Sequence, residues 1–208
     1  MINYKTCKIY PNVQIGRDVI IGDFCIIGNP PQGKNSGELK TIIGDNAVIR
    51  ANTIIYAGNI IGENFQTGHH VTVREYNKIG NNVSIGTSTC VEHHIEIQNN
   101  VRIHSQAFIP EYTILEESCW LGPNVVLTNA KYPRSKNVKA NLKGAIIRRN
   151  AKIGANVTLL PGVIVGENAL IGSGTVVIKD VPTNKVIVGN PGKIIKDIRE
   201  LDEYRRED

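Results

Sequence analysis

The chain has 208 residues and a formal net charge of +5, and its 41% hydrophobic residues include few aromatic ones. Its basic residues form no stripe interleaved with aromatic rings, which argues against a nucleic-acid partner. No apolar run reaches the length of a membrane span, and the first ten residues lack the apolar core of a signal peptide. The four cysteines form no CxxC pair. We therefore expect a cytoplasmic protein with a thin aliphatic core, no membrane partner and small anionic ligands.

An aliphatic residue recurs every six positions from Ile43 to Leu127. Of the 15 positions in this register, 14 are Ile, Leu or Val, and the exception is Thr67. A period of six fits neither an α-helix nor an ordinary strand, which repeat at 3.6 and 2 residues. It is typical of a short strand followed by a corner, repeated along the chain. The sequence therefore predicts an all-β solenoid with three hexads in each coil.

The N-terminal part of the chain enters this repeat gradually. Residues 1–12 are predicted to form an incomplete coil or cap, and the first full coil ends at Ile27. A polar loop at 29–40, rich in Pro, Gly and charge, then leaves the solenoid because it cannot continue the repeat. Five uninterrupted coils follow, from 43 to 127.

A second loop at 129–144 precedes two more coils, which end at Val177. Both loops leave after the third hexad of a coil, so we expect them at one corner of a triangular prism. The 24 hexads make eight coils, which at about 4.8 Å each give a height of roughly 38 Å. The solenoid is predicted to span 1–188, followed at 189–208 by a turn and a short amphipathic α-helix.

Stacked coils place each residue beside the one 18 positions later, so each corner can be read as a column. The first corner, which follows the first hexad of each coil, carries Asn46, Asn64, Asn82, Asn100, Ser118, Asn150 and Asn168. Asparagine tolerates the left-handed backbone that such turns need. This corner is therefore predicted to be structural.

The other two corners are chemically mixed, and four of the five histidines lie on them. The second corner carries Ala51-Asn52, His69-His70, Thr87-Ser88, Ser105-Gln106, Pro123-Asn124, Ala155-Asn156 and Ser173-Gly174. The third corner carries Ala57-Gly58, Glu75-Tyr76, His93-His94, Glu111-Tyr112, Asn129-Ala130, Pro161-Gly162 and Lys179-Asp180. A turn does not need paired histidines, so these two corners are predicted to carry function.

For His69 and His70 we favour catalysis, because a neutral imidazole near pH 7 is the usual proton acceptor. A surface ladder of charge pairs explains His93 equally well, since glutamates flank it in the neighbouring coils. His94 lies between Tyr76 and Tyr112, which fits either simple stacking or one wall of a sugar site.

The hexapeptide pattern resembles the left-handed β-helix acyltransferases, and the segment 151–193 is similar to their coenzyme-A end. The resemblance implies a left-handed parallel β-helix and a homotrimer that binds acetyl-CoA between subunits. It places Ala155 and Ser173 along the pantetheine arm of the coenzyme. Lys179 and Lys193 match positions that commonly contact its nucleotide end.

The segment WLGPNVVLTNAKYPRS, residues 120–135, resembles nucleotide-sugar N-acetyltransferases. These enzymes acetylate an amino group on a UDP- or dTDP-linked deoxysugar for surface polysaccharides, including lipopolysaccharide. Galactoside and xenobiotic acetyltransferases carry a catalytic histidine on the loop corresponding to 129–144. That loop has no histidine here, which moves the predicted base to His70 or His69.

The same resemblance implies contacts with the acceptor. Arg74 and Arg134 are candidates for its diphosphate, whereas His94 and Tyr112 are candidates for its sugar ring. The alternatives are a sugar O-acetyltransferase, a non-catalytic scaffold and a zinc enzyme of the γ-class carbonic anhydrase kind. The zinc pattern is broken, because His104 is followed five residues later by Ile109, and no metal ligand is predicted. The sequence leaves open the sugar, the nucleotide, the amine position and the acyl length.

Overall fold

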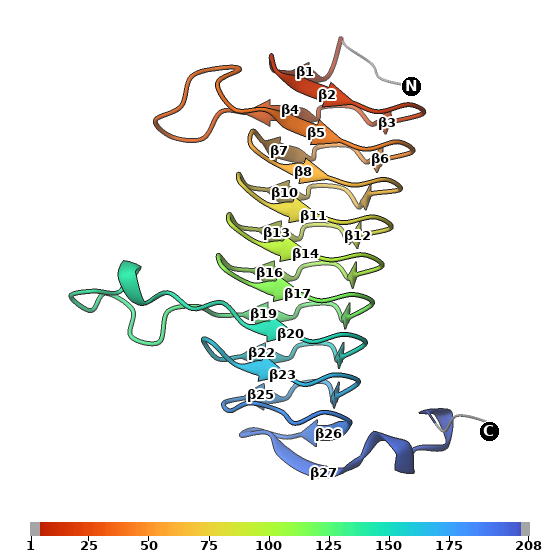
Figure 1. The fold of residues 1–208 in the computed structure, drawn as a ribbon, viewed down its shortest axis with the longest axis vertical. Helices are drawn as coiled ribbons and strands as arrows, with labels where there is room; N and C mark the ends of the chain where they lie inside the picture. The colour runs from red at the N-terminus through yellow and green to blue at the C-terminus, as the bar shows by residue number, and fades with distance from the viewer. Residues whose placement is uncertain (1–4, 205–208) are drawn as a thin grey trace.

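The computed structural model describes residues 5–204, which wind into a triangular prism (Figure 1). Its walls are three sheets whose strands run parallel, except for the last strand of one sheet. The eight-stranded sheet consists of β2 (Val13–Ile15), β5 (Thr41–Ile43), β8 (Ile60–Ile61), β11 (Lys78–Ile79), β14 (Glu96–Ile97), β17 (Ile114–Leu115), β20 (Ile146–Ile147) and β23 (Ile164–Val165). The ten-stranded sheet consists of β3 (Ile20–Ile21), β6 (Val48–Ile49), β9 (Gln66–Thr67), β12 (Ser84–Ile85), β15 (Arg102–Ile103), β18 (Trp120–Leu121), β21 (Lys152–Ile153), β24 (Leu170–Ile171), β26 (Lys185–Val188) and β27 (Lys193–Asp197). The nine-stranded sheet consists of β1 (Lys8–Ile9), β4 (Ile26–Asn29), β7 (Ile54–Tyr56), β10 (Thr72–Val73), β13 (Cys90–Val91), β16 (Phe108–Ile109), β19 (Val126–Leu127), β22 (Thr158–Leu159) and β25 (Val176–Val177).

The strand register confirms the predicted hexads. Residues 18 apart pair side by side in all three walls, as shown by Val73 with Val91, Ile79 with Ile97 and Ile85 with Ile103. The first, second and third corners therefore join the eight- to the ten-stranded, the ten- to the nine-stranded and the nine- to the eight-stranded sheet. Asparagines on the first corner adopt positive φ, and Asn64 Nδ2 donates to Asn82 Oδ1 at 2.9 Å. This corner is structural, as predicted.

The core is one continuous column of buried aliphatic side chains. It has one irregular layer, where Thr67 replaces the expected aliphatic residue. Phe65, two positions earlier, is fully buried, although the corresponding positions in the adjacent coils hold Ala47 and Val83. The larger ring of Phe65 therefore fills the space that the threonine leaves.

Both loops leave the prism at the third corner, on the same side of the molecule (Figure 1). The first connects β4 with β5, and the second connects β19 with β20 and contains the short 3-10 helix η1 (Lys139–Asn141). Both follow the third hexad of a coil, as the sequence predicts. No helix within residues 5–204 has the length and apolar character needed to cross a membrane.

The C-terminal segment differs from the predicted α-helix. Strand β27 instead pairs antiparallel with β26, with Ile194 opposite Ile187. Two 3-10 helices follow, η2 (Ile198–Glu200) and η3 (Asp202–Tyr204), and residues 205–208 lie outside the described part of the chain. The prediction was wrong because β26 offers an edge of backbone donors and acceptors that this segment can satisfy. A short helix would need another surface against which to bury its apolar face.

Within the predicted solenoid of residues 1–188, the repeat continues past Val177, where the last predicted hexad ends. Ile187 pairs with Ile171, and Val181 forms a bridge with Val165, so these two residues begin a ninth coil. Both are offset by 16 residues from their partners rather than 18, because the third corner is shorter here. That change of period conceals the last hexads in the sequence.

Candidate functional site

The two predicted catalytic histidines lie exposed on the second corner. His70 adopts a φ of 56°, and its backbone N–H donates to the Ala51 carbonyl at 3.1 Å. Within the described chain, neither imidazole makes a hydrogen bond or ion pair. A general base is normally oriented by a second polar group, and neither histidine has one in this protomer.

The backbone at His70 leads to a prediction about stability. A non-glycine residue in the left-handed region costs about 1 kcal/mol, and asparagine tolerates it best. We expect His70→Asn to raise the free energy of unfolding in urea by less than about 1 kcal/mol, because asparagine relieves only part of this cost. His69→Asn is the matched control and should give no gain, since the φ of His69 is not positive. Equal effects of the two substitutions would contradict this account.

His69 also lines a groove of about 570 Å³ on the ten-stranded sheet. We call it the arginine groove, because Arg50 and Arg102 line it together with His69 and His104. Hydroxyl groups of serine and threonine complete the wall, and no aspartate or glutamate lines it. The groove therefore offers cationic and neutral donors, which suits an anionic ligand.

His104 is the most enclosed imidazole in this groove. Its ring packs against Trp120 with centroids 4.7 Å apart, and its buried Nε2 has no hydrogen-bond partner. Burial lowers the pKa of His104, and the neighbouring Arg102 lowers it further. The ring is therefore neutral at pH 7, and it leaves the positive charge of the groove to the arginines.

The third corner gathers a second set of polar side chains. His93 Nδ1 lies 2.8 Å from His94 Nδ1, and Glu111 approaches His93 Nε2 at 3.5 Å. The His94 ring lies between Tyr76 and Tyr112, with centroid distances of 5.0 and 5.9 Å. The structure thus brings together the predicted sugar contacts His94 and Tyr112.

The predicted phosphate contact Arg74 is already paired. It forms ion pairs with Glu75 at 2.7 Å and Glu92 at 2.9 Å, so its charge is compensated. Arg134 lies exposed in the second loop, at a φ of 62°. Two other guanidinium groups line the groove with His69, those of Arg50 and Arg102, and the sequence analysis did not predict them. Arg50 Nη1 donates to the Thr67 carbonyl at 2.5 Å, and within residues 5–204 neither arginine forms an ion pair. Both lie on the outer face of the ten-stranded sheet, next to core positions. Comparing the residues of that face at intervals of 18, as was done for the corners, would have predicted them.

The predicted coenzyme contacts occupy the C-terminal half of the prism. Ala155 and Ser173 lie on the second corner, below His69 in the same column. Five coils separate His69 from Ser173, roughly 24 Å at about 4.8 Å per coil. Lys179 and Asp180 line a pocket of about 290 Å³ together with Pro191, Gly192 and Ile194. Lys193 is adjacent in sequence to two of these residues but does not line the pocket. An extended coenzyme arm matches this spacing.

The second and third corners are separate edges of one protomer. Six residues of chain cross the nine-stranded sheet from His70 to Tyr76, roughly 20 Å at about 3.3 Å per residue. The predicted base and the predicted sugar contacts therefore do not meet within one chain. Any site that uses both edges needs a second copy.

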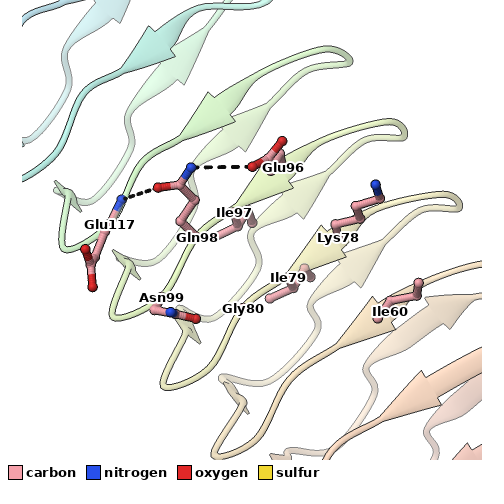
Figure 2. Close-up of a pocket in the computed structure, with 9 residues that line it drawn as sticks. All are labelled: Ile60, Lys78, Ile79, Gly80, Glu96, Ile97, Gln98, Asn99 and Glu117. Atoms are coloured by element: carbon pink, nitrogen blue, oxygen red, sulfur yellow. Dashed lines mark hydrogen bonds between the residues drawn. The ribbon is translucent and has the colours of Figure 1, made fainter.

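A groove of about 430 Å³ on the eight-stranded sheet is a weaker candidate (Figure 2). Gln98 Nε2 donates to Glu96 Oε1 at 3.4 Å, and Gln98 Oε1 accepts from the Glu117 backbone N–H at 3.1 Å. One lysine, Lys78, and two glutamates, Glu96 and Glu117, line it, and no histidine does. The groove therefore has neither a base nor a net positive charge.

Neither a reactive cysteine nor a metal centre is found in the described part of the chain. Burial and the nearby Glu92 raise the pKa of the Cys90 thiol to about 11, so it stays protonated at neutral pH and is a poor nucleophile. Across residues 5–204, no group of three or more His, Cys, Asp or Glu side chains is placed to hold a metal ion.

Known proteins show the same repeat. The family described as bacterial transferase hexapeptide (six repeats) matches residues 144–179, and the hexapeptide repeat of succinyl-transferase matches residues 18–57. The UDP-N-acetylglucosamine acyltransferase of Francisella novicida has a similar fold, with a TM-score of 0.79 at 19% identity over 96% of this chain and 71% of that one. The fold is therefore a left-handed β-helix built from the hexapeptide repeat of transferases.

Two curated relatives are acetyltransferases. Galactoside O-acetyltransferase of Escherichia coli is 32% identical over 101 residues, which cover 46% of this chain and 50% of the relative. The 2,3,4,5-tetrahydropyridine-2,6-dicarboxylate N-acetyltransferase of Clostridium perfringens is 38% identical over 80 residues, which cover 38% of this chain and 31% of the relative. The chain spans half or less of the length of these relatives.

Proposed function

We propose that this protein transfers an acetyl group from acetyl-CoA to the amino group of a sugar linked to UDP or dTDP, a precursor of surface polysaccharide. Acetyl transfer is supported by the two relatives, one of which acetylates oxygen and the other nitrogen. The proposed enzyme is a homotrimer with its sites between subunits.

The arginine groove is the observation that supports an acceptor linked to a nucleotide. A nucleoside diphosphate is a compact dianion, and two arginines without competing carboxylates suit it. His69 lies in the same groove, at the edge where the donor arm is proposed to run. An acceptor with its diphosphate between Arg50 and Arg102 would place its sugar near that edge.

The proposed donor lies along the second corner. Its pantetheine arm runs past Ala155 and Ser173, and its nucleotide end contacts Lys179 and Lys193. A backbone N–H of the coil would stabilise the oxyanion as the acceptor nitrogen attacks the thioester carbonyl. His69 and His70 contact the acceptor at the upper end of this arm. Arg134 lies on the second loop at the third corner, so it would approach the diphosphate only from a neighbouring copy.

The test is thiol release from acetyl-CoA with matched acceptors. We expect turnover with a UDP- or dTDP-linked amino sugar, and much less with the same amino sugar lacking the nucleotide. The groove assignment predicts that Arg102→Ala raises KM for the nucleotide sugar about 10-fold or more, the value of one charge-assisted hydrogen bond. For the amino sugar without a nucleotide, Arg102→Ala should change KM less, because that acceptor has no diphosphate for Arg102 to bind.

Arg149→Ala is the matched control for that substitution, since Arg149 is exposed on the first corner and faces Glu117 at 3.6 Å. Its KM should stay within about threefold of wild type. Equal KM changes for Arg102→Ala and Arg149→Ala would rule out the groove as the diphosphate site.

Sugar O-acetylation is the second candidate, because the galactoside relative acetylates a hydroxyl group. The same assay separates the two reactions when the amino sugar is replaced by its hydroxyl analogue. Faster turnover of the hydroxyl analogue would establish the O-acetyltransferase. A neutral hydroxyl needs a strong base, whereas an amine does not.

A further inference from the structure

The third corner holds bulky rings where a turn prefers asparagine. Tyr76, His94 and Tyr112 occupy successive coils with φ of 60°, 56° and 66°. The same turn position on the first corner is asparagine in nearly every coil. Rings in this backbone region are strained, and strained residues concentrate at functional sites. The ring column therefore has a use beyond closing the turn.

Beside these rings, Glu111, His93 and His94 form a chain of polar contacts. Glu111 Oε1 lies 3.5 Å from His93 Nε2, and the two imidazoles meet through their Nδ1 atoms at 2.8 Å. The carboxylate favours a proton on His93 Nε2, which leaves His93 Nδ1 as an acceptor. His94 Nδ1 must then donate to it. His94 Nε2 is thus left without a proton, on an exposed ring.

The neighbouring charged side chains do not change these proton positions on His93 and His94. Glu75 and Glu92 both pair with Arg74, so their charges are compensated. Glu111 is held from the other side by Asn129 Nδ2 at 2.5 Å, where the second loop begins. Glu111 is therefore the carboxylate that orients the pair, and the loop fixes it in place.

We infer that His94 is the proton acceptor of the proposed acetyl transfer, with His93 and Glu111 as positioning residues. The inference rests on the proposed function. The acceptor amine attacks the thioester carbonyl carbon, the carbon–sulfur bond breaks, and the coenzyme leaves as its thiolate. His94 Nε2 takes the proton that the amine loses and returns it to the thiolate. Tyr76 and Tyr112 form the walls against which the sugar ring packs.

This assignment also constrains the donor. His94 and the second corner lie on separate edges of the nine-stranded sheet, so one coenzyme on the second corner does not reach His94 of the same chain. A neighbouring copy must bring the donor to this edge. Two inactive variants, His94→Asn and Ser173→Trp, should therefore regain activity when they are refolded together.

The kinetic test compares His94→Asn with His69→Asn in the thiol-release assay. Asparagine keeps the left-handed turn but accepts no proton. We expect His94→Asn to lower kcat about 100-fold or more, and His69→Asn to act mainly on KM. Glu111→Gln should lower kcat as well, because the carboxylate orients His93 and, through it, the His94 ring. Glu63→Gln, on the first corner, should leave kcat unchanged.

A kcat within threefold of wild type for His94→Asn would overturn the inference and leave the proposed acetyltransferase function intact.

The tautomer of His94 provides a test that needs no turnover. Long-range ¹H–¹⁵N correlation on the five histidines should show His94 protonated at Nδ1 near pH 8, and Glu111→Gln should weaken that preference. A His94 ring protonated at Nε2 would equally overturn the assignment. Absence of any wild-type turnover would count against the proposed function instead.

Discussion

Replacing Phe65 with alanine is expected to lower the free energy of unfolding by about 3–5 kcal/mol. Phe65 is fully buried in a coil whose neighbours hold Ala47 and Val83 at that position. The ring fills the space beside Thr67, and a solenoid with one narrow core has little freedom to close a void. Urea denaturation followed by circular dichroism measures the loss.

Ile85→Val is the control, since it removes one methylene group from the adjacent coil and should cost about 0.5–1.5 kcal/mol. The double substitution Phe65→Val with Thr67→Ile restores the pattern of the next coils, Val83 with Ile85. The loss of unfolding free energy in the double variant should be smaller, by at least about 1 kcal/mol, than the sum of the losses in the two single variants. Strict additivity would contradict the idea that the two residues compensate for each other.

Reversing the charge of Lys179 and Lys193 together is expected to raise KM for acetyl-CoA about 100-fold or more, with kcat at saturating donor within about threefold. The two lysines are proposed to hold the anionic nucleotide end of the coenzyme, which does not react. Their contacts are therefore equally strong in the ground state and the transition state. Steady-state kinetics with Lys179→Glu/Lys193→Glu checks this.

Lys40→Glu provides the charge-matched control, because Lys40 is exposed at the opposite end of the prism. Acetyl-pantetheine, which lacks the nucleotide, should show nearly the same KM with wild type and double variant. A similar KM change for both donors, or a change below threefold for acetyl-CoA, would remove these lysines from the coenzyme site.

Much of the fold can be predicted from the sequence, because the spacing of a repeat determines which residues pair in neighbouring coils. One inward side chain every six residues fixes the strand, its face and its neighbour 18 positions away, so the walls and the loop corner are predicted together. The prediction fails where the repeat ends. The 16-residue offset of Val181 and Ile187 hides the last coil, and the β26 edge turns a helix-like pattern into strand β27.

The candidate site is less predictable, because its chemistry depends on side-chain contacts between coils. The column at the third corner places His93 near Glu111, but the sequence does not say which ring nitrogens meet. That contact distinguishes His94, with an oriented partner, from His69 and His70, which have none. Likewise, the pairing of Arg74 with Glu75 and Glu92 appears only once the rotamers are known.

Acetyl transfer itself is tested most directly by identifying the product formed from acetyl-CoA and a UDP- or dTDP-linked amino sugar. The proposed function predicts free coenzyme A and N-acetylated nucleotide sugar in equal amounts, measured by thiol titration and mass spectrometry. Neither product across a panel of such sugars, together with no acetyl-CoA-dependent rise in Tm, would contradict it.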